Sequence, residues 1–332
     1  MTNKPRILVV GSFVMDVIAT TERVPHSAQT VYGKAFHMAP GGKGANQALQ
    51  CARLGADVTM VGCVGNDLFG HELLETPRKA GVDVSHVVVR SGVSSGVGHV
   101  TLEVTEHTAQ NRIVVIPGAN RTLTLEEVDW LRGEIGTYDM VLLQLEIPLE
   151  VNRAVAGWAK AAGVPVMLNP ASATDLDDEL LRLVTYLTPN EQEASVETGL
   201  PLAMEDGNPS RKDLEQIAAV LRSKGVVHII LTLGGCGSAG GSEHGIQYIP
   251  CVKMGHVADP TAAGDSFVGA FCVGLTAGLT QEEALAFASH TAAITVSRMG
   301  AMPSVPTLEE VLALLWERDY RGFDPTLLDM LK

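Results

Sequence analysis

The chain has 332 residues, and its 46% of hydrophobic and 19% of charged residues are ordinary values for a globular protein with a sizeable core. Its formal net charge of −14 argues against nucleic acid as a partner, because an acidic surface repels a phosphate backbone. No apolar run is long enough to cross a membrane, so a membrane partner is not expected either.

The cysteines and the first residues bear on the cellular compartment. Five cysteines are scattered along the chain without a CxxC pair, which argues against a disulfide framework and against structural zinc. They are Cys51, Cys63, Cys236, Cys251 and Cys272. The apolar run at 7–10 has only four residues, which is typical of a strand and not of a signal peptide. We therefore expect a reduced, cytoplasmic location.

Short apolar runs alternate with helical stretches along most of the chain. The runs expected to form buried strands are 7–10, 58–64, 140–146, 164–169, 186–190 and 226–235. The stretches with helical spacing are 44–54, 68–80, 150–162, 211–224, 265–278 and 281–297. This alternation predicts an α/β fold with a mostly parallel sheet covered on both faces, a three-layer α/β/α sandwich. Pro77 should kink or shorten its helix, and 317–332 reads as a terminal extension.

Two stretches break the alternation of strands and helices. Residues 13–38 and 94–116 contain short runs of alternating apolar and polar residues, typical of half-exposed antiparallel strands. We predict that they form a small β-sheet lid on a core made of 1–12, 39–93 and 117–332. A hydrophobic face on such a lid would pair with a second copy and give a homodimer.

The first segment that could carry chemistry is APGGKGANQALQCARLG at 39–55. Its double glycine lets the backbone approach a ligand closely, and Gly55 ends the helix that follows. Lys43 and Asn46 fall on an exposed first turn, where they could meet a polar ligand. A tight turn before a packed helix, with Lys43 in solvent, fits the segment equally well. It is not a Walker A loop, because Gly44 follows the lysine in place of Ser or Thr.

The second segment is DPTAAGDSFVGAFCVGL at 259–275. A loop of small residues at 260–264 leads into an apolar helix, so free amides and the helix dipole converge to form an anion hole. Asp265 lies at the edge of that hole. A carboxylate is unfavourable there unless it has a task, such as accepting a proton from an attacking hydroxyl. The alternative is that Asp265 caps the helix.

The third segment is LTPNEQEASVETG. Thr188, Pro189 and Glu191 fit a capping box with proline at the first helical position. Asn190 and Glu193 are then not needed for capping. One carboxylate and one amide could hold hydrated Mg²⁺ near phosphates, since Mg²⁺ keeps its waters and takes few protein ligands.

Other candidates carry less information on their own. Asp16 and Glu146 follow apolar strands, at the edge where α/β proteins place their sites. Thr232 and Gly234 end the last long apolar strand and could line a nucleotide pocket. His290 lies in a helix of small residues and could pack against a base, although a buried structural histidine is the favoured interpretation.

These segments, in this order, resemble the ribokinase family of sugar kinases, also called the phosphofructokinase-B family. The match runs from Arg6 to about Val311. It comprises GGKGANQA (41–48), LLQLE (142–146), NPA (169–171), TPNE (188–191), TLGG (232–235), AAGDSFVGA (262–270) and GAMPSVP (300–306). The first and sixth match the two family signatures, and the set is most similar to the branch that gives the family its name. The resemblance implies an ATP-dependent kinase that phosphorylates the terminal (5-position) hydroxyl of ribose or a related pentose.

The resemblance also implies roles for single residues. Asp265 would be the catalytic base, and the amides of Ala262, Ala263 and Gly264 would form the anion hole. The positions that would contact the sugar are Val14, Asp16, Gly42, Lys43, Asn46 and Glu146. Those near the nucleotide would be Asn190, Glu193, Thr232, Gly234, Gly237 and His290.

Two cations are implied in the same way. Asn190 and Glu193 would organise Mg²⁺ and the phosphates, with Glu193 acting through water. The positions that match a monovalent cation site, usually potassium, are Asp259, Thr261, Thr295, Arg298, Gly300 and Ser304. Family members of this kind are commonly dimers joined through the lid.

Two departures from the family pattern concern the substrate. Members of this branch usually carry Asn two residues before the aspartate that matches Asp16, whereas Val14 stands there in this chain. Valine cannot bond a hydroxyl, and burying one unpaired costs about 1–3 kcal/mol. The lid also reads SAQ at 27–29 where the family has Pro-Gly-Glu. A kinase for 2-deoxyribose, a nucleoside or another sugar therefore stays open.

Two other functional classes are disfavoured. A sugar-binding regulator without catalysis would not need Asp265, Asn190 and Glu193 intact. A nicotinamide dehydrogenase would need a glycine-rich pyrophosphate turn after the first strand, and the sequence there is GSFVMD.

Overall fold

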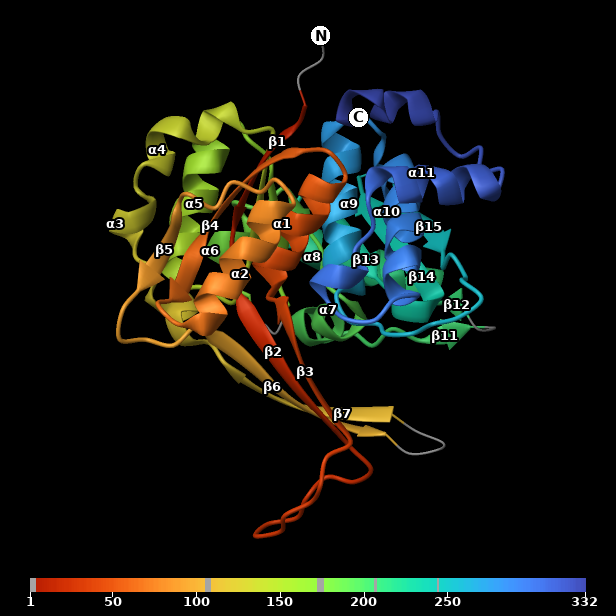
Figure 1. The fold of residues 1–332 in the computed structure, drawn as a ribbon. Helices are drawn as coiled ribbons and strands as arrows, with labels where there is room; N and C mark the ends of the chain where they lie inside the picture. Colours follow the sequence, from red (N-terminus) through yellow and green to blue (C-terminus); the bar gives the residue numbers. More distant parts are fainter. Residues whose placement is uncertain (1–3, 105–108, 172–175, 206–207, 244) are drawn as a thin grey trace.

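The computed structural model describes residues 4–104, 109–171, 176–205, 208–243 and 245–332. A nine-stranded sheet with helices on both faces forms its core, and a separate four-stranded sheet projects from one end (Figure 1). The predicted three-layer α/β/α fold is thus confirmed. The chain begins and ends at the side of the core opposite the four-stranded sheet (Figure 1).

The central sheet has the strand order β15-β14-β13-β10-β9-β8-β1-β4-β5. Its strands are β1 (Arg6–Val10), β4 (Asp57–Gly65), β5 (Val87–Arg90), β8 (Met140–Gln144), β9 (Val166–Asn169), β10 (Tyr186–Leu187), β13 (His228–Thr232), β14 (Gly237–Ser242) and β15 (Gly245–Pro250). The strands from β13 to β5 pair in parallel, and β14 and β15 add an antiparallel edge. The carboxyl ends of the parallel strands therefore meet at one edge of the core, where sites form in such sheets.

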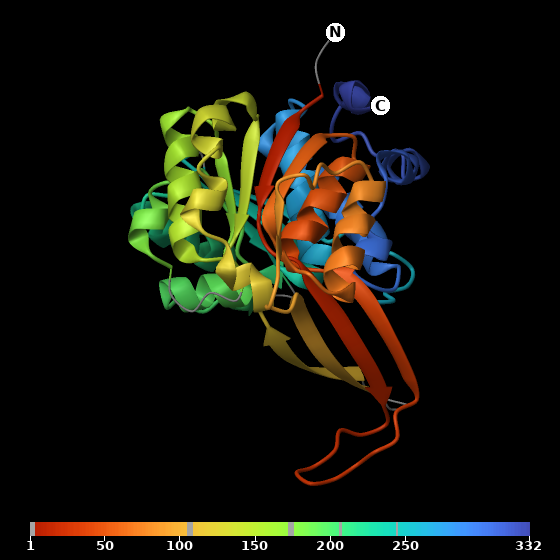
Figure 2. The same cartoon turned by 60° about the vertical axis from the view of Figure 1, so that its left-hand side comes forward.

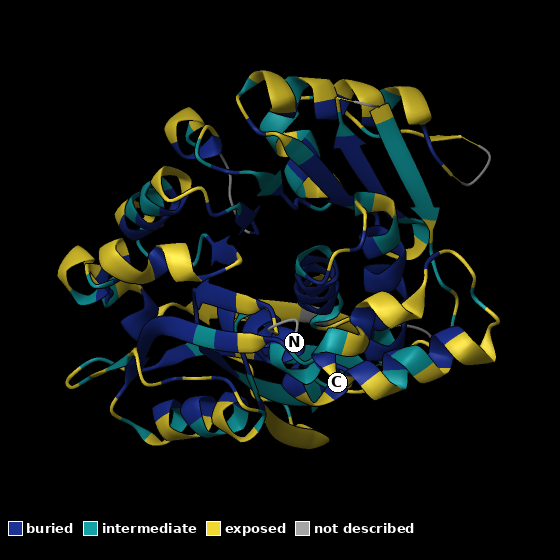
Figure 3. Cartoon of the chain, turned by 90° about the horizontal axis from the view of Figure 1, so that it is seen from above, coloured by how far each residue is buried: buried dark blue, intermediate teal, exposed yellow. Residues whose placement is uncertain are grey.

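Strand β1 shows why helices cover both faces of this sheet. Ile7 and Val9 belong to one buried apolar cluster, whereas Leu8 and Val10 belong to the other. Successive side chains of a strand point to opposite faces, so a strand without polar positions needs cover on both sides. Figure 3 shows the result, with buried strands inside and exposed positions on the outer surfaces of the helices.

Each buried cluster is completed by its own set of helices. One set comprises α1 (Lys43–Arg53), α2 (Leu68–Lys79), α9 (Ala263–Thr276), α10 (Gln281–Val296) and α11 (Leu308–Glu317). The other comprises α3 (Leu125–Val128), α4 (Leu131–Glu134), α5 (Leu149–Ala161), α6 (Asp178–Leu181), α7 (Glu191–Thr198) and α8 (Arg211–Ser223). None of the described helices combines the length and apolar character that a membrane span requires.

Helices α1 and α9 approach each other closely. A Cβ atom at Gly269 of α9 would lie 2.9 Å from the Cβ of Gln50 and 3.1 Å from the carbonyl oxygen of Gln47, both in α1. Only glycine leaves room for this contact. The contact brings the start of α9, with Asp265, beside the start of α1, with Lys43 and Asn46.

The four-stranded sheet has the order β3-β2-β6-β7, built from β2 (Val14–Thr21), β3 (Ala35–Gly41), β6 (Gly96–Val104) and β7 (Ala109–Ile116). Figure 2 shows it extending away from the core as a thin layer. The strands come from the two stretches expected to form the lid, except that β3 continues to Gly41 in the expected core. Residues 105–108 of the expected lid and 1–3 of the expected core lie outside the described residues. The expected antiparallel arrangement is only partly correct, because β2 and β6 pair in parallel. Both strands leave the same edge of the core, and this gives them the same direction.

The structure also shows the places of Pro77 and of the terminal extension at 317–332. Pro77 lies two residues before the end of α2 at Lys79, so only the last turn loses an amide donor. The terminal extension packs onto the core through Phe323, Leu328 and Leu331, which are all buried.

Candidate active site

The start of α9 has the geometry of an anion site. Ala262, the N-cap residue, has a left-handed backbone with φ of 59°, which is uncommon for a residue other than glycine. Ala263 N donates to Pro260 O at 3.2 Å, so this amide is partly engaged in a turn. The first bond to the N-cap carbonyl comes from Ser266 N, at 2.8 Å. The amide of Gly264 precedes that bond, at the positive end of the helix dipole.

A pocket of about 400 Å³ opens beside the start of α9. Four residues expected near a nucleotide line it together with two residues of the anion site: Asn190, Thr232, Gly234, Gly237, Ala263 and Gly264. Val257, Phe267, Ala292 and Val296 supply apolar walls. A ligand with a flat apolar ring would fit between these walls, and its charged groups could then reach the start of α9.

Asn190 and Glu193 have a capping role that the sequence interpretation assigned to other residues. Asn190 is the N-cap of α7, its Oδ1 accepts from Glu193 N at 2.8 Å, and Glu193 Oε2 accepts from Asn190 N at 3.0 Å. The predicted box of Thr188 and Glu191 is wrong. The chain stays extended through Asn190, which forms a bridge with Thr232, so the helix begins later than expected.

His290 is not among the residues that line this pocket. It is 5% exposed, its Nδ1 lies 2.8 Å from Ala286 O, and its ring is 4.6 Å from that of Tyr320 in the terminal extension. Burial lowers the pKa of His290 and favours the neutral ring. The structural interpretation of this histidine fits these contacts, and the expected packing against a base does not.

Asp265 faces α1 and does not cap its own helix. It is 6% exposed, and its Oδ2 accepts a hydrogen bond from Asn46 Nδ2 at 2.9 Å. Its Oδ1 accepts from Gln47 Nε2 at 3.0 Å. The N-cap position belongs to Ala262, so the capping alternative is wrong. Asn46 is itself 5% exposed, which corrects the expected exposed turn, because α9 packs across the start of α1.

Three carboxylates and one ammonium group gather around Asp265. Burial first, and then the charges of Glu146 and Asp265, raise the pKa of Asp16 to about 6. Burial disfavours the charged form of Lys43, but Asp265, Glu146 and Glu193 outweigh it and raise its pKa. Charges act this strongly only at short range. The charged residues expected to bind a sugar and Mg²⁺ are therefore near enough to influence one another's charge.

Glycines at the base of the lid leave room for this cluster. A Cβ at Gly98 would lie 2.2 Å from Asp16 Oδ1, and one at Gly41 would lie 3.3 Å from Asp16 Oδ2. Gly42 has φ of 97°, and a Cβ there would lie 2.6 Å from the backbone nitrogen of Val14. Gly42 therefore serves close packing between the lid and α1, and Val14 is buried at that junction.

Ser12, Gln47 and Gln144 belong to the same network, although sequence reasoning did not single them out. Ser12 Oγ donates a short hydrogen bond to Glu146 Oε2. Gln144 Nε2 donates to Gln47 Oε1 at 2.6 Å. Signals for two of them were present: Gln47 follows Asn46 inside the glycine motif, and Ser12 follows the first strand.

The residues expected to bind a monovalent cation come from the loop before α9, from the end of α10 and from the segment that follows α10. Asp259 joins the first and the last of these, because its Oδ1 accepts from Thr261 N at 2.9 Å and its Oδ2 accepts from Gly300 N at 3.0 Å. Burial raises the pKa of Asp259, but these hydrogen bonds outweigh it and lower the value. Thr295 Oγ1 donates to Ser266 Oγ at 2.7 Å, which connects the end of α10 to the residue after Asp265.

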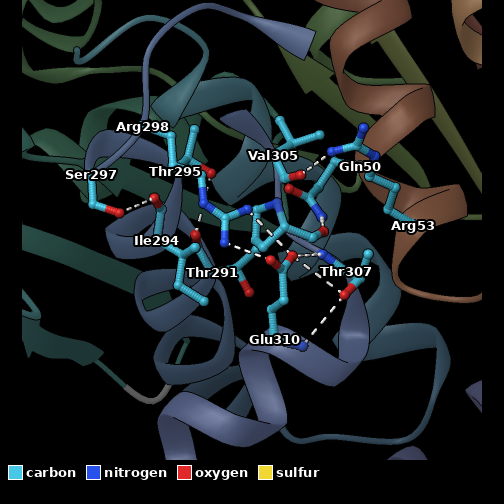
Figure 4. Close-up of polar contacts among 11 residues, drawn as sticks. Gln50, Arg53, Thr291, Ile294, Thr295, Ser297, Arg298, Val305, Thr307 and Glu310 are labelled. Atoms are coloured by element: carbon cyan, nitrogen blue, oxygen red, sulfur yellow. Dashed lines mark hydrogen bonds and ion pairs between the residues drawn. The ribbon is translucent and has the colours of Figure 1, made fainter. Parts of the chain in front are cut away.

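Two of these cation residues have side chains that are already engaged. The side chain of Arg298 points at Glu310, with 2.6 Å between Nη2 and Oε1 (Figure 4). Ser304 Oγ donates to Ala301 O at 2.7 Å. Arg298 can therefore offer only its carbonyl oxygen to a cation. Carboxylate and carbonyl oxygens are hard donors, which suits K⁺ chemically.

Comparisons with known proteins identify the family of the chain. The family described as pfkB family carbohydrate kinase matches residues 4–308. A ribokinase of Bacillus subtilis (strain 168) is 38% identical over 312 residues, which cover 93% of this chain and 99% of that protein. A ribokinase of Schizosaccharomyces pombe is 37% identical over 312 residues, with coverage of 92% and 96%.

A solved structure gives the same result for the fold. The structure of Arabidopsis thaliana ribokinase complexed with ribose and ATP has a TM-score of 0.85 and 32% sequence identity, and it covers 97% of this chain and 100% of that one. The chain therefore belongs to the pfkB family of carbohydrate kinases, and its enzyme class is that of a ribokinase-like sugar kinase. The family expected from the motifs is confirmed.

Proposed function

We propose that this protein transfers the terminal phosphoryl group of ATP to the 5-hydroxyl of ribose. The observation that carries the proposal is the position of Asp265. Its Oδ2 accepts a hydrogen bond from Asn46 within the cluster that includes Asp16, Lys43 and Glu146, and the preceding residue, Gly264, lines the pocket beside the start of α9. A hydroxyl held between the two would lie next to both a proton acceptor and the incoming phosphate.

The sugar would be held by the cluster around Asp265. Asp16 and Glu146 offer carboxylate oxygens to hydroxyl donors, and Lys43 offers an ammonium group. The buried Asn46 Oδ1 has no hydrogen-bond partner among the described residues, as expected of an acceptor reserved for a ligand. Asp265 would accept the proton of the attacking hydroxyl, and the amides at the start of α9 would stabilise the charge on the transferring group.

Mg²⁺ fits the donor chemistry beside the pocket. Glu193 uses Oε2 for the cap of α7, which leaves Oε1 to bind a metal-bound water. Across the described residues, no three His, Cys, Asp or Glu side chains form a metal cluster, and a hydrated ion needs no such cluster. When bound, Mg²⁺ would neutralise charge on the ATP phosphates. Glu193 would orient its water, and Asn190 would remain at the wall of the pocket.

A monovalent cation would bind between the loops joined by Asp259. Because the loop at 259–261 leads directly into Ala262, an ion there would stabilise the left-handed turn that aims the α9 amides. We expect K⁺ to raise kcat several-fold relative to an equal concentration of a large organic cation. Equal rates in both salts would exclude this role.

The lid would join two copies of the chain. Ile113 and Val115 are exposed apolar residues of β7. They lie on the same face of the sheet as Asp16, because the strand register pairs Val115 with Gly98 and Gly98 with Asp16. A second lid would cover this face. Light scattering should give a dimer, and Ile113→Glu should shift it to a monomer.

All five cysteines are unpaired, which supports a reducing location such as the cytoplasm.

Sugar-dependent release of ADP tests the proposed function. Purified protein with MgATP should release ADP when ribose is added, with a higher kcat/KM for ribose than for 2-deoxyribose or nucleosides. A preference for 2-deoxyribose would show that Val14 changes the substrate. No sugar-dependent release with any pentose, hexose or nucleoside would contradict the proposal.

A further inference from the structure

Gln47 is a fully buried polar residue that the proposed chemistry leaves without a task. Its Nε2 donates to Asp265 Oδ1 at 3.0 Å, while Asn46 Nδ2 donates to Oδ2 at 2.9 Å. Each oxygen of the carboxylate therefore has its own amide donor, and the two donors come from consecutive residues of α1. Two separate donors fix the rotation of a carboxylate about its Cβ–Cγ bond, which one donor cannot do.

The orientation of Gln47 is fixed by a second amide. Gln144, the last residue of β8, donates Nε2 to Gln47 Oε1 at 2.6 Å. Since that oxygen accepts this bond, the NH₂ group of Gln47 is the group that faces Asp265. Gln47 Nε2 also lies 3.4 Å from Asn169 Oδ1, and Asn169 Nδ2 donates to Thr188 O at 2.8 Å.

The network is attached to the middle of the central parallel sheet. Gln144 pairs with Asn169 in the parallel sheet, and Gln144 O accepts from Asn152 Nδ2 at 3.0 Å. A Cβ at Gly11 would lie 1.9 Å from Gln144 Oε1, so glycine at the end of β1 leaves the space for this amide. The side chain of Gln144, which orients Gln47, therefore lies among three neighbouring strands, β1, β8 and β9. Rigid elements position catalytic groups better than loops do.

We propose that Gln47, oriented by Gln144, is a positioning residue that keeps the Asp265 carboxylate directed at the sugar hydroxyl. The inference rests on the proposed kinase activity. Without Gln47, the Asp265 carboxylate would keep one hydrogen-bond donor, Nδ2 of Asn46. The Oδ1 atom of Asn46 would be left for the sugar. Phosphoryl transfer depends on positioning, so a rotated carboxylate would lower turnover without weakening substrate binding.

Gln47→Leu removes the donor, and Gln50→Leu is the matched control. Gln50 is also fully buried in α1, but its amide donates to Pro306 O at 3.0 Å and accepts from Ser266 Oγ at 2.7 Å. Figure 4 shows it beside Arg53 and Val305. We expect Gln47→Leu to lower kcat by about 10–100-fold while the KM values change by less than about threefold.

The control should lose a comparable amount of thermal stability and keep kcat near that of the wild type. Equal losses of kcat in the two variants would show that any buried amide of α1 has this effect, and the inference would be wrong. An unchanged kcat in Gln47→Leu would also overturn it.

Gln47→Glu provides a readout that a merely structural role would not affect. The new side chain has nearly the same shape and still accepts from Gln144. At low pH the introduced carboxyl is protonated and can donate to Asp265 as glutamine does. As pH rises it ionises, loses the donor and repels the neighbouring carboxylate. We expect the ratio of variant kcat to wild-type kcat to fall by about tenfold between pH 5.5 and 8.5.

A ratio that rises or stays constant with pH would overturn the inference. Turnover would then not depend on a hydrogen-bond donor at position 47 that positions the Asp265 carboxylate. This variant keeps the test valid if Gln47→Leu does not fold. Failure of the proposed function can be distinguished from failure of this inference, because the wild-type protein would then release no ADP with ribose. Failure of the inference would leave the wild type active and the pH ratio flat.

Discussion

The two halves of the candidate site are built on opposite principles. The sugar half crowds Asp16, Glu146 and Asp265 around Lys43, and amides and hydroxyls hold these groups in place. The nucleotide half is a pocket with apolar walls and glycine-rich strand ends. Like charges held together cost folding free energy, whereas apolar walls do not. The sugar, which accepts the phosphoryl group, would thus be selected by charged groups. ATP, which donates it, would be selected by the shape of the pocket and by backbone amides.

The largest effect is expected where the two halves meet. Asp265→Asn removes the proton acceptor and should lower kcat by about 10²–10⁴-fold. ATP binds in the other half, so its Kd by calorimetry should stay within about twofold of the wild type. Near-normal turnover would remove Asp265 from the role of base, and a large loss of ATP affinity would show that the halves are not independent.

Asp16→Asn tests the sugar half alone. The variant loses a charged acceptor, so KM for ribose should rise about 10–100-fold. The free protein should nevertheless melt at a higher temperature at pH 7.5, because a carboxyl with a pKa raised to about 6 opposes folding there by roughly 1–3 kcal/mol.

Asp67→Asn is the matched control for the stability measurement. Burial raises the pKa of Asp67, but hydrogen bonds from Ser95 and Gly70 outweigh it and lower the value. Asparagine can still cap α2, but its NH₂ group cannot accept the hydrogen bond that Ser95 N donates to Asp67 Oδ2, so the replacement should lower the melting temperature. The comparison would be contradicted if both variants shifted stability in the same direction.

Ala292→Phe tests the apolar half. Ala292 lines the nucleotide pocket, and a ring there would occupy space that the base needs. KM for ATP should rise about tenfold or more, because an occupied pocket loses its apolar contact area. Ribose affinity, measured without nucleotide, should not change and serves as the internal control. A parallel loss of ribose affinity would mean that the two halves are coupled.

The pH dependence of the wild type should show the smallest effect. With a folded pKa of about 6 and an ordinary value of 3.8, protonated Asp16 is favoured by the folded state. The contribution of Asp16 to the stability of the free protein should therefore decline as pH rises from about 4 to 6 and then level off. Ribose affinity should change in the opposite direction, rising up to about pH 6, because the sugar needs the ionised acceptor. Asp16→Asn should abolish both trends.

Regular elements were predictable where periodicity was strong. The helix expected at 281–297 is Gln281–Val296 in the structure, and the strand expected at 7–10 is Arg6–Val10. Strand β14, which lies between β13 and β15, was missed, because its sequence GSAGGS has neither apolar alternation nor bulk. The start of α7 was misplaced, because pairing with Thr232 keeps Asn190 extended and overrides the preference for proline at the first helical position.

Within the site, residues in glycine-rich motifs were predictable and residues that support them were not. Asn46 and Asp265 stand in segments whose glycines and helix starts indicate ligand contact. Gln47 looks like any polar helix residue, and its burial follows only from the packing of α9 on α1. The residue pattern favoured a buried structural histidine at His290, which its contact with Tyr320 fits, whereas the resemblance alone placed it near the nucleotide.

The bond between Asn46 and Asp265 joins positions 219 residues apart in the chain. A ribosome must therefore synthesise four-fifths of the polypeptide before the first half of the site meets its partner. Nascent or truncated chains would have the glycine motif without the group that it orients. Sugar-dependent turnover should consequently appear late in refolding, together with the slowest recovery of native fluorescence, and should report the assembly of the whole core.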